Sequence, residues 1–281
     1  MHEPKEEIIR KMFTRFEVRV NNILLTDNTD LAIETYDLCE ALPGDTTKEE
    51  LKESGYILNG AVSFNEKLTL CYKGINSFVC KVIYDEREIK SLKQCFNIFG
   101  GEEQLQAAYN ITSFDFIKTN TDKNLMMMPL YQNTLEMFLM ADGDKFVPIH
   151  LYKEIKVAID YLHSKNYAHM DIKPANICMN DGKIILVDLQ SIAPFGEKTY
   201  STNAYLPFEL IQKNVNFTIS SKETDYWMLA MTLAEKCCGL QIGGSKYHTK
   251  ADVINILKGC KDERDEDCLF IELCSCLESY L

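Results

Sequence analysis

The feature that most constrains this chain is a short polar stretch set between two apolar runs, His-Met-Asp-Ile-Lys-Pro-Ala-Asn at residues 169–176. The pattern before it is helical and closes at residues 161–163. Residues 184–187 after it are typical of a buried strand. The sequence therefore predicts a polar loop held between a helix and a strand of the core.

Four polar side chains fall on this loop and at the end of the following strand, namely Asp171, Lys173, Asn176 and Asp188. Two carboxylates, an amide and an ammonium group held together suit the handling of a metal-bound polyphosphate. One carboxylate can orient a hydroxyl group, and the other can bind Mg²⁺. The competing interpretation is a loop of polar residues that only cap the neighbouring elements.

The same stretch resembles the catalytic loop of protein kinases, H-x-D-x-K-P-x-N, followed by the position of their D-F-G motif. The resemblance implies that Asp171 is the catalytic base and that Lys173 steadies the transferred phosphate. It also implies that Asn176 and Asp188 bind Mg²⁺. His169 is interpreted as structural, a packed histidine that bridges the loop to the core.

Two departures from the kinase pattern bear on regulation. Met170 stands where many kinases have an arginine that meets a phosphorylated activation segment. Its presence predicts that activity does not wait for such phosphorylation. Asp188-Leu189-Gln190 replaces D-F-G, so Leu189 can serve as the apolar plug, while Gln190 restricts the backbone where a kinase has glycine.

The part of the chain before this loop shows five strand patterns, which resemble a kinase small lobe. A kinase has a glycine-rich hairpin at the first of them, where backbone N–H groups approach the phosphates. This chain lacks that motif, since Ile57 stands at the middle position between Gly55 and Gly60. The strand patterns cover residues 56–64, 68–72, 77–84, 111–118 and 125–128.

The resemblance also implies which residues bind the nucleotide phosphates. Lys81 ends Phe-Val-Cys-Lys, which looks like the V-A-I-K strand and makes it the lysine that pairs with the phosphates. Glu88, in the helical pattern of residues 85–92, is the implied partner of Lys81. Glu102 and Glu103 are the alternatives for that partner.

Residues 128–131, Met-Pro-Leu-Tyr, fall where kinases have the hinge that binds adenine. Met128 would be the gatekeeper residue. Pro129 has no N–H group to donate, so hydrogen bonds to adenine would come from Leu130 or Tyr131.

The remainder resembles a kinase large lobe. The amphipathic pattern of residues 149–164 looks like the long helix that leads to the catalytic loop. Asp225, which opens a later helix, looks like the aspartate that ties down the catalytic-loop backbone. A simple charge at a helix N-terminus is the alternative. Further helices are predicted over residues 135–140, 249–257 and 267–277.

Residues 188–209 resemble a short activation segment. Thr202, Tyr205 and the Pro-Phe-Glu sequence at 207–209 match its end, and Glu209 would be a structural anchor. Arg264 is a suggested partner for Glu209.

Residues 1–53 precede this core and show helical patterns over residues 6–20, 31–42 and 49–54. Two interpretations compete. These helices form either a brace packed on the small lobe or a segment that binds a regulatory protein. The brace is favoured because the apolar faces need burial.

The composition argues against several classes of protein. A net charge of −12 argues against nucleic-acid binding as the main task. The eleven cysteines show no zinc-ligand spacing, and a thiol-rich chain of this kind indicates a reducing compartment. Neither a signal peptide nor an apolar run long enough to span a membrane is evident. We expect a cytoplasmic or nuclear protein, in the host cytoplasm if a pathogen encodes it.

Together these features predict an α+β, two-lobed kinase-like fold with an N-terminal helical extension at residues 1–53, a five-stranded antiparallel small lobe at 54–131 and a mainly helical large lobe at 132–281. The resemblance implies a serine/threonine protein kinase that uses ATP and Mg²⁺ on a protein substrate. A pseudokinase that acts as a binding module is one alternative, and a small-molecule phosphotransferase is another.

Overall fold

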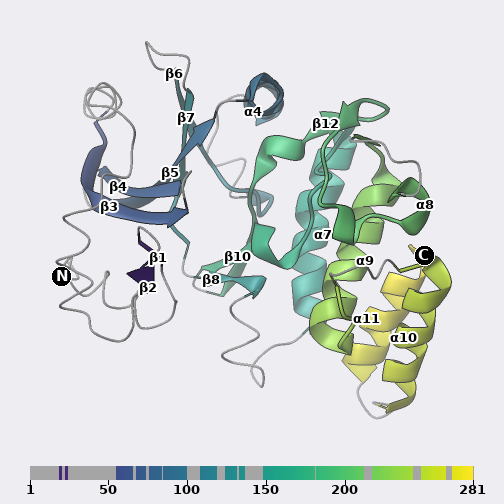
Figure 1. Cartoon of the computed structure of the whole chain (residues 1–281). Coiled ribbons are helices and arrows are strands. Elements are labelled where there is room, and N and C mark those ends of the chain that lie inside the picture. The colour runs from purple at the N-terminus through teal and green to yellow at the C-terminus, as the bar shows by residue number, and fades with distance from the viewer. Residues whose placement is uncertain are drawn as a thin grey trace. The chain divides into compact units, whose positions relative to one another are not determined.

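The computed structural model divides into two compact units, each described here by itself (Figure 1). The first comprises Met1–Glu86 and Ser113–Leu130, and the second Arg87–Thr112 and Tyr131–Leu281. The structure describes residues 19–20, 23–24, 55–65, 68–73, 76–83, 85–99, 108–118, 124–131, 133–136, 148–180, 182–211, 217–242, 248–263 and 268–280.

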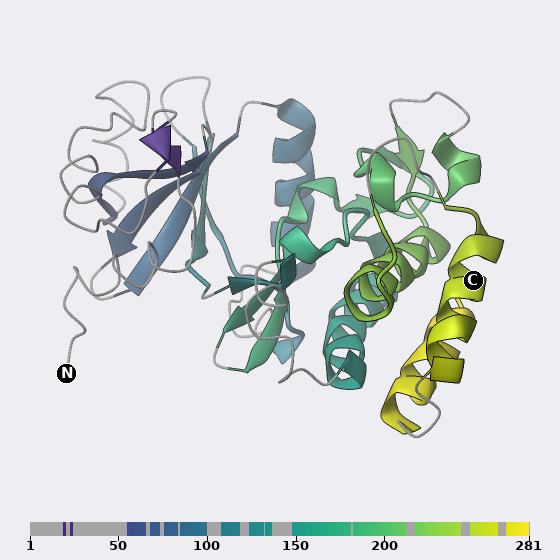
Figure 2. The same ribbon diagram turned by 60° about the horizontal axis from the view of Figure 1, so that its bottom comes forward.

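The first unit contains an antiparallel five-stranded sheet with strand order β3-β4-β5-β7-β6, seen in blue and teal in Figure 2. All five predicted strands are present, although the one expected over residues 111–118 is shorter. The strands are β3 (Ile57–Asn65), β4 (Leu68–Lys73), β5 (Asn76–Ile83), β6 (Asp115–Lys118) and β7 (Asn124–Pro129).

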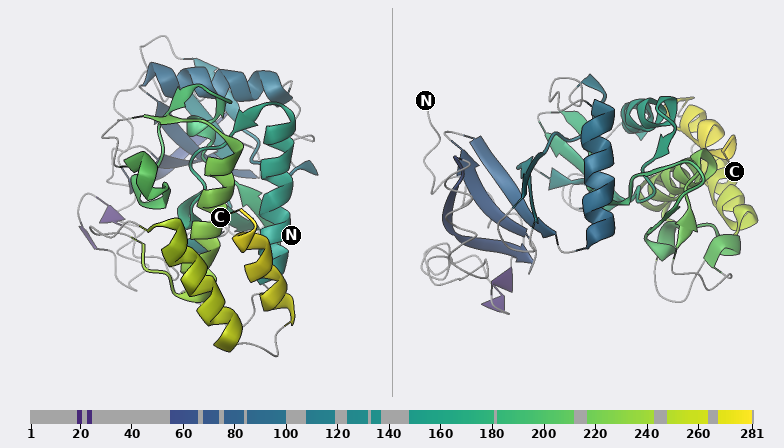
Figure 3. Two further views of the ribbon diagram at one scale, coloured as in Figure 1. Left: turned by 90° about the vertical axis from the view of Figure 1, so that its right-hand side faces the viewer. Right: turned by 90° about the horizontal axis from the view of Figure 1, so that it is seen from above.

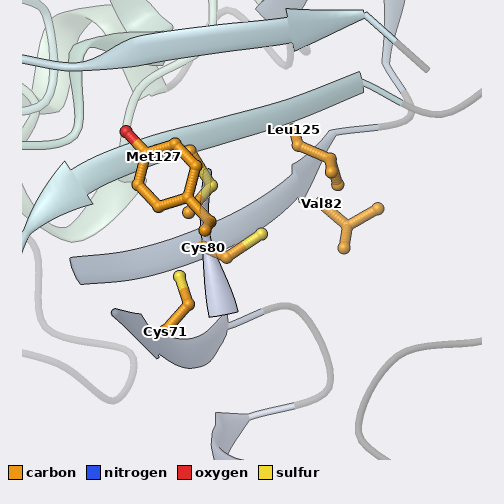
Figure 4. Packing of buried hydrophobic residues seen from close by; sticks show 6 residues of the cluster. Cys71, Cys80, Val82, Leu125 and Met127 are labelled. Carbon is orange, nitrogen blue, oxygen red and sulfur yellow. The ribbon is translucent and has the colours of Figure 1, made fainter. Parts of the chain in front are cut away.

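One face of this sheet buries the core of the first unit (Figure 4). Alternate residues of a strand point to the same face, so Cys80 and Val82 of β5 both contribute. Tyr56 packs edge-on against Phe78, with ring centroids 5.3 Å apart. The buried members of the cluster are Tyr56, Cys71, Cys80, Val82, Leu125 and Met127.

The predicted N-terminal extension lies mostly outside the described residues. Its described part is a short antiparallel pair of strands, β1 (Arg19–Val20) and β2 (Ile23–Leu24). The helical pattern predicted over residues 6–20 is therefore wrong at its end. Val18-Arg19-Val20 alternates apolar and polar residues, a period that suits a strand better than a helix.

Helix α4 (Glu86–Phe99) confirms the helix predicted from residue 85. Almost all of it groups with the second unit, whereas the sequence assigned residues 54–131 to one lobe. The reason is its packing. Leu92, Cys95 and Phe99 are buried, and the Cys95 thiol donates a hydrogen bond to the carbonyl oxygen of Leu189 at 3.9 Å.

The second unit is built around helix α9, whose middle is apolar on all sides. Residues 228–231 of this helix are each fully buried, and Trp227 beside them is 6% exposed. A helix buried all round belongs in the middle of a helical layer. Helices α7, α10 and α11 pack against it, as the two views of Figure 3 show in teal, green and yellow.

Capping residues mark both the beginning and the end of α9. The Ser221 hydroxyl accepts a hydrogen bond from the N–H of Thr224, and Gly239 ends the helix at a φ of 70°. The predicted helices of this unit are present as α7 (Pro148–Ser164), α9 (Lys222–Cys238), α10 (Lys250–Glu263) and α11 (Cys268–Glu278), with the short α8 (Phe208–Ile211) between α7 and α9.

Short strands and turns complete the second unit and position its loops. The pairs are β10–β11, β8–β10, β9–β12 and β13–β14, all antiparallel. The elements are β8 (Asn133–Thr134), β9 (Tyr167–Ala168), β10 (Ile177–Asn180), β11 (Lys183–Leu186), β12 (Ala193–Pro194), β13 (Lys198–Thr199), β14 (Thr218–Ile219) and the 3₁₀ helices η1 (Pro174–Asn176), η2 (Leu189–Ser191) and η3 (Asn203–Tyr205).

Among the described helices, none has the length and apolar character needed to cross a membrane. Most of the helix predicted over residues 135–140 lies outside the described residues, as do Glu102, Glu103 and Arg264.

Candidate functional site

One buried carboxylate, that of Asp225, holds the backbone of the polar loop of residues 169–176. Asp225, in the first turn of α9, accepts hydrogen bonds from the backbone N–H groups of His169 and Met170, both at 2.8 Å. His163, at the end of α7, lies 2.9 Å from the same carboxylate through Nε2. Asp225 thus makes the contact with the loop backbone that the sequence led us to expect, and it is fully buried.

His169 fixes the loop from inside. Its Nδ1 accepts a hydrogen bond from the N–H of Asp171 at 3.2 Å, since a backbone N–H can only donate. The proton of the neutral ring is therefore on Nε2, which donates to the carbonyl oxygen of Val187 at 3.1 Å. The ring is buried and joins the loop to the end of β11, which fits the structural role predicted for it.

Asp171 lies at the centre of a closed network of hydrogen bonds. Its Oδ1 accepts from the hydroxyl and the N–H of Thr202, at 2.6 and 3.1 Å. Its Oδ2 accepts from Lys173 Nζ at 2.9 Å and from the Asn176 amide at 2.8 Å. The Thr202 hydroxyl also accepts from Lys173 Nζ at 2.7 Å, so Asp171, Lys173 and Thr202 form a ring of contacts.

This network keeps Asp171 ionised. Burial alone would raise the pKa of its carboxyl group, but the Lys173 ammonium and the hydrogen bonds from Lys173 and Thr202 outweigh it. The pKa therefore lies below its ordinary value. A carboxylate that stays charged and surrounded by donors can accept a proton or orient a hydroxyl group.

Asn176 directs both of its amide N–H bonds at Asp171, one to the backbone oxygen and one to Oδ2, each at 2.8 Å. Its own oxygen, Oδ1, is thereby left for a metal. The N–H of Val187 donates to the carbonyl oxygen of Asn176 at 2.9 Å and continues the β10–β11 ladder. This pairing brings Asp188, one residue further on, to the strand end beside Asn176.

Asp188 itself adopts the left-handed backbone conformation, with φ of 60° and ψ of 65°. Non-glycine residues adopt this conformation rarely, and such strain is concentrated at functional sites. Met170 shows the same feature with φ of 66°, and it is completely buried.

The donor set fits Mg²⁺ rather than a metal held by the protein alone. The described residues include no group of three or more histidine, cysteine or acidic side chains that would hold a metal. Mg²⁺ is usually bound by one or two carboxylates together with substrate phosphates. The Asn176 amide oxygen and the Asp188 carboxylate match that requirement.

The predicted nucleotide-binding residues of the first unit lie on its sheet. Lys81 is half-buried on β5 and Met128 is half-buried on β7, and the two strands are paired. The N–H of Leu130 donates to the carbonyl oxygen of Ser77 at 3.0 Å. Of the two N–H groups predicted to meet adenine, that of Tyr131 is therefore the better candidate.

Tyr131, Glu88 and Glu209 complete the set of predicted residues. Tyr131 belongs to the second unit, where its hydroxyl pairs with that of Thr112 at 2.9 Å. Glu88 lies on α4, also in the second unit, so its pairing with Lys81 stays a prediction. Glu209 on α8 has an exposed side chain, and its role as an anchor likewise stays a prediction.

Two contributors to the site were not assigned a role from the sequence. Thr202 was placed only in the activation segment, yet it makes two of the hydrogen bonds to Asp171. His163 was seen only as the end of a helix, yet it shares the Asp225 carboxylate with the loop. The sequence separations, 31 and 62 residues, left no local signal for either contact.

The sequence of this chain is similar to those of known proteins. The model of the protein kinase domain family matches residues 67–268. A serine/threonine-protein kinase of Caenorhabditis elegans is 35% identical over 100 residues, which cover 34% of this chain and 22% of that protein. A probable serine/threonine-protein kinase of Dictyostelium discoideum is 26% identical over 215 residues, 68% of this chain and 42% of that protein. The chain thus spans less than half the length of these relatives.

A solved structure has a similar fold. The structure of the Cydia pomonella granulovirus kinase matches with a TM-score of 0.55 and 15% sequence identity. The match covers 75% of this chain and 82% of the viral chain. At this identity the likeness concerns the fold, and it agrees with the two-lobed α+β architecture predicted from the sequence.

Proposed function

Because this chain belongs to the protein kinase domain family, we propose that it transfers the γ-phosphate of ATP to a serine or threonine hydroxyl group of a protein. The observation that carries the proposal is the network around Asp171, in which a buried carboxylate, an ammonium group and an amide converge. Positioning and charge stabilisation account for most of the catalysis in phosphoryl transfer, and these groups supply both.

In the proposed mechanism Asp171 orients the acceptor hydroxyl and accepts its proton. Both oxygens of Asp171 already accept two hydrogen bonds each, which fills the lone pairs of a carboxylate. An incoming hydroxyl must therefore displace one donor. The Asn176 amide is the natural one to move, because it keeps its other hydrogen bond, to the backbone oxygen of Asp171, while Thr202 stays in place. Lys173 stays and neutralises charge on the transferred group.

Asn176, through Oδ1, and Asp188, through its carboxylate, are the residues that would hold Mg²⁺. The metal would supply positive charge at the phosphate oxygens of the nucleotide. Lys81 would bind the nucleotide phosphates with Glu88 as its partner, and Met128 and Tyr131 would border the adenine. These assignments follow from the family pattern.

The substrate and the compartment are also part of the proposal. A protein substrate is supported by the serine/threonine-protein kinase relatives and by the Lys-Pro sequence of the loop. A reducing compartment such as the cytosol is supported by the free thiols of the cysteines whose side chains the structure describes.

The test is a transfer assay with radiolabelled ATP and Mg²⁺, in which the chain is offered a serine- and threonine-containing peptide library. Asp171→Asn is the matched control, with its fold checked by circular dichroism. We expect acid-stable phosphate on the peptides with the unmodified protein and at least about 100-fold less with Asp171→Asn. Equal incorporation by the two proteins would refute the kinase proposal.

Two other outcomes would each support a rival function. If Mg²⁺-ATP stabilises the protein against heat without any phosphate transfer, the chain is a pseudokinase, which the Asp188-Leu189-Gln190 sequence and the missing glycine-rich hairpin favour. If sugars, choline or aminoglycosides are phosphorylated and peptides are not, it is a small-molecule phosphotransferase.

A further inference from the structure

Two cations on one face of α4 contact the segment that leads to Thr202. Arg87 and Lys90 lie three residues apart, so they share a face of the helix. Lys90 pairs with Glu197 at 3.2 Å. Figure 3 shows α4, in blue, beside the green segment that carries these contacts.

Arg87 makes the more specific of the two contacts. Its guanidinium carbon lies 4.3 Å from the centre of the Tyr200 ring and 5.5 Å from that of Phe217. Both distances are within the range of cation–π attraction. The two rings lie 4.9 Å apart, so the guanidinium group covers an aromatic pair and not a single side chain.

The aromatic pair continues the β13–β14 ladder. Thr199 lies opposite Thr218, and the next residues along, Tyr200 and Phe217, bring their rings together across the strands. Beyond this pair the ladder ends, and the chain runs through Ser201 to Thr202. The last fixed point before Thr202 is therefore the aromatic pair under Arg87.

The position of Thr202 depends on the position of the Tyr200–Phe217 pair. Its N–H and its hydroxyl both bind Asp171 Oδ1, and these two bonds need the backbone of residue 202 to be in place. Tyr200 is only two residues away, so a shift of its ring is passed on through one intervening residue. The contact at Tyr200 is partly open to water, since this side chain is 36% exposed.

We propose that Arg87 is a positioning residue for the phosphotransfer site: its guanidinium group holds the Tyr200–Phe217 pair and thereby keeps Thr202 against Asp171. The Lys90–Glu197 pair assists, although both side chains are largely exposed and the contact is weakened by salt. This inference rests on the proposed kinase function for its kinetic part only.

A double-mutant cycle tests it. Arg87→Ala should lower kcat about 3- to 10-fold, the scale expected for loss of cation–π contacts at an exposed site. The KM for ATP should change less than about twofold, because Thr202 contacts Asp171 and not the nucleotide. In the background of Thr202→Val, Arg87→Ala should cost nothing more, since the group it positions is already lost.

Matched variants separate the ring contact from charge. Arg87→Lys keeps the positive charge without the planar group and should recover only part of the loss. Lys93→Ala removes another exposed cation of the same helix and should leave kcat unchanged. Equal effects of Arg87→Ala and Lys93→Ala, or fully additive effects of Arg87→Ala and Thr202→Val, would overturn the inference.

Hydrogen exchange provides a readout that needs no activity. Amides of residues 200–206 should exchange several-fold faster in Arg87→Ala than in the unmodified protein or in Lys93→Ala. If the chain transfers no phosphate at all, the proposed function fails, yet this exchange measurement still decides whether Arg87 orders the segment. Unchanged exchange in Arg87→Ala would refute the positioning role.

Discussion

At the scale of single residues, Thr202 is the side chain whose importance emerges only in three dimensions. Its hydroxyl accepts from Lys173 and donates to Asp171, the same two groups proposed to meet the acceptor hydroxyl of a substrate. Thr202 therefore fixes the positions of the two groups that the proposed mechanism uses.

Replacing Thr202 should expose this role. Thr202→Val keeps the shape but removes the hydroxyl, and loss of hydrogen bonds to a charged group costs about 1.5–3 kcal/mol. We expect kcat to fall roughly 10- to 100-fold on that basis. Thr202→Ser keeps the hydroxyl and should retain most of the activity. Steady-state kinetics with both variants checks the prediction, which equal rates would contradict.

Asp225 should matter for stability at least as much as for catalysis. Asn at this position presents an N–H₂ group to donors that now face a carboxylate oxygen, so at least one buried N–H group loses its partner. Such a loss costs about 1–3 kcal/mol. We therefore expect Asp225→Asn to lower Tm by roughly 2–12 °C, measured by thermal denaturation.

The control for Asp225→Asn is an exposed pair on the same unit. Glu272 pairs with Lys153 at 3.1 Å, and both side chains are about half exposed. Glu272→Gln should change the free energy of unfolding by less than about 1 kcal/mol. Comparable losses of Tm in the two variants would show that the buried contacts of Asp225 carry no special weight.

At the scale of elements, α9 illustrates how a local signal fixes a buried helix. The Ser221 hydroxyl satisfies the N–H of Thr224 at 3.1 Å and opens the turn that carries Asp225. Ser221→Ala should destabilise the protein by about 1 kcal/mol. The matching fall in Tm is about 2–4 °C in a differential scanning measurement, with Ser221→Asp, which restores a capping oxygen, close to the unmodified protein.

Residues 188–209, which resemble an activation segment, lead to a prediction about regulation. Their contacts need no phosphate. The N–H groups of Phe195 and Gly196 donate to the carbonyl oxygens of Asn166 and Ser220, at 3.0 and 2.9 Å. The Tyr205 hydroxyl donates to the Glu235 carboxylate at 2.7 Å. Met170 stands where many kinases have an arginine that binds a phosphate there. We expect a preparation treated with phosphatase to keep its transfer rate within about twofold, because these contacts persist. A loss of activity that returns on rephosphorylation would contradict this.

Elements were more predictable than contacts. The five strands of the first sheet and α7, α9, α10 and α11 follow from hydrophobic period and from turn or cap residues, all of which are local signals. The polar loop of residues 169–176 was predictable for the same reason, since Asp171, Lys173 and Asn176 lie within six residues. Arg87 and Tyr200, in contrast, meet across more than a hundred residues, and only tertiary packing brings them together.

The grouping of α4 was unpredictable for a related reason. Its sequence defines a helix from Glu86 to Phe99, but nothing local says on which unit the buried face packs. The buried face packs on the second unit, where the Cys95 thiol donates to the carbonyl oxygen of Leu189. That contact spans 94 residues.

At the scale of the whole molecule, the proposal predicts that a bound nucleotide stabilises the folded protein. A ligand that binds only the folded protein raises the free energy of unfolding by about 2.7 kcal/mol at one hundred times its Kd. Mg²⁺-ATP should therefore raise Tm by several degrees. Asp188→Asn should remove the part of the shift that depends on Mg²⁺, and Lys81→Met the part that depends on ATP. Thermal shift with and without EDTA measures both, and unchanged Tm in the unmodified protein would argue against nucleotide binding.

The single tryptophan of the chain has a practical consequence for such experiments. Trp227 on α9 is almost fully buried, so selective excitation of its indole follows the second unit, while the first remains optically silent. Comparing the emission of this built-in probe with the total heat absorbed would reveal whether the two units melt as one cooperative body or in succession.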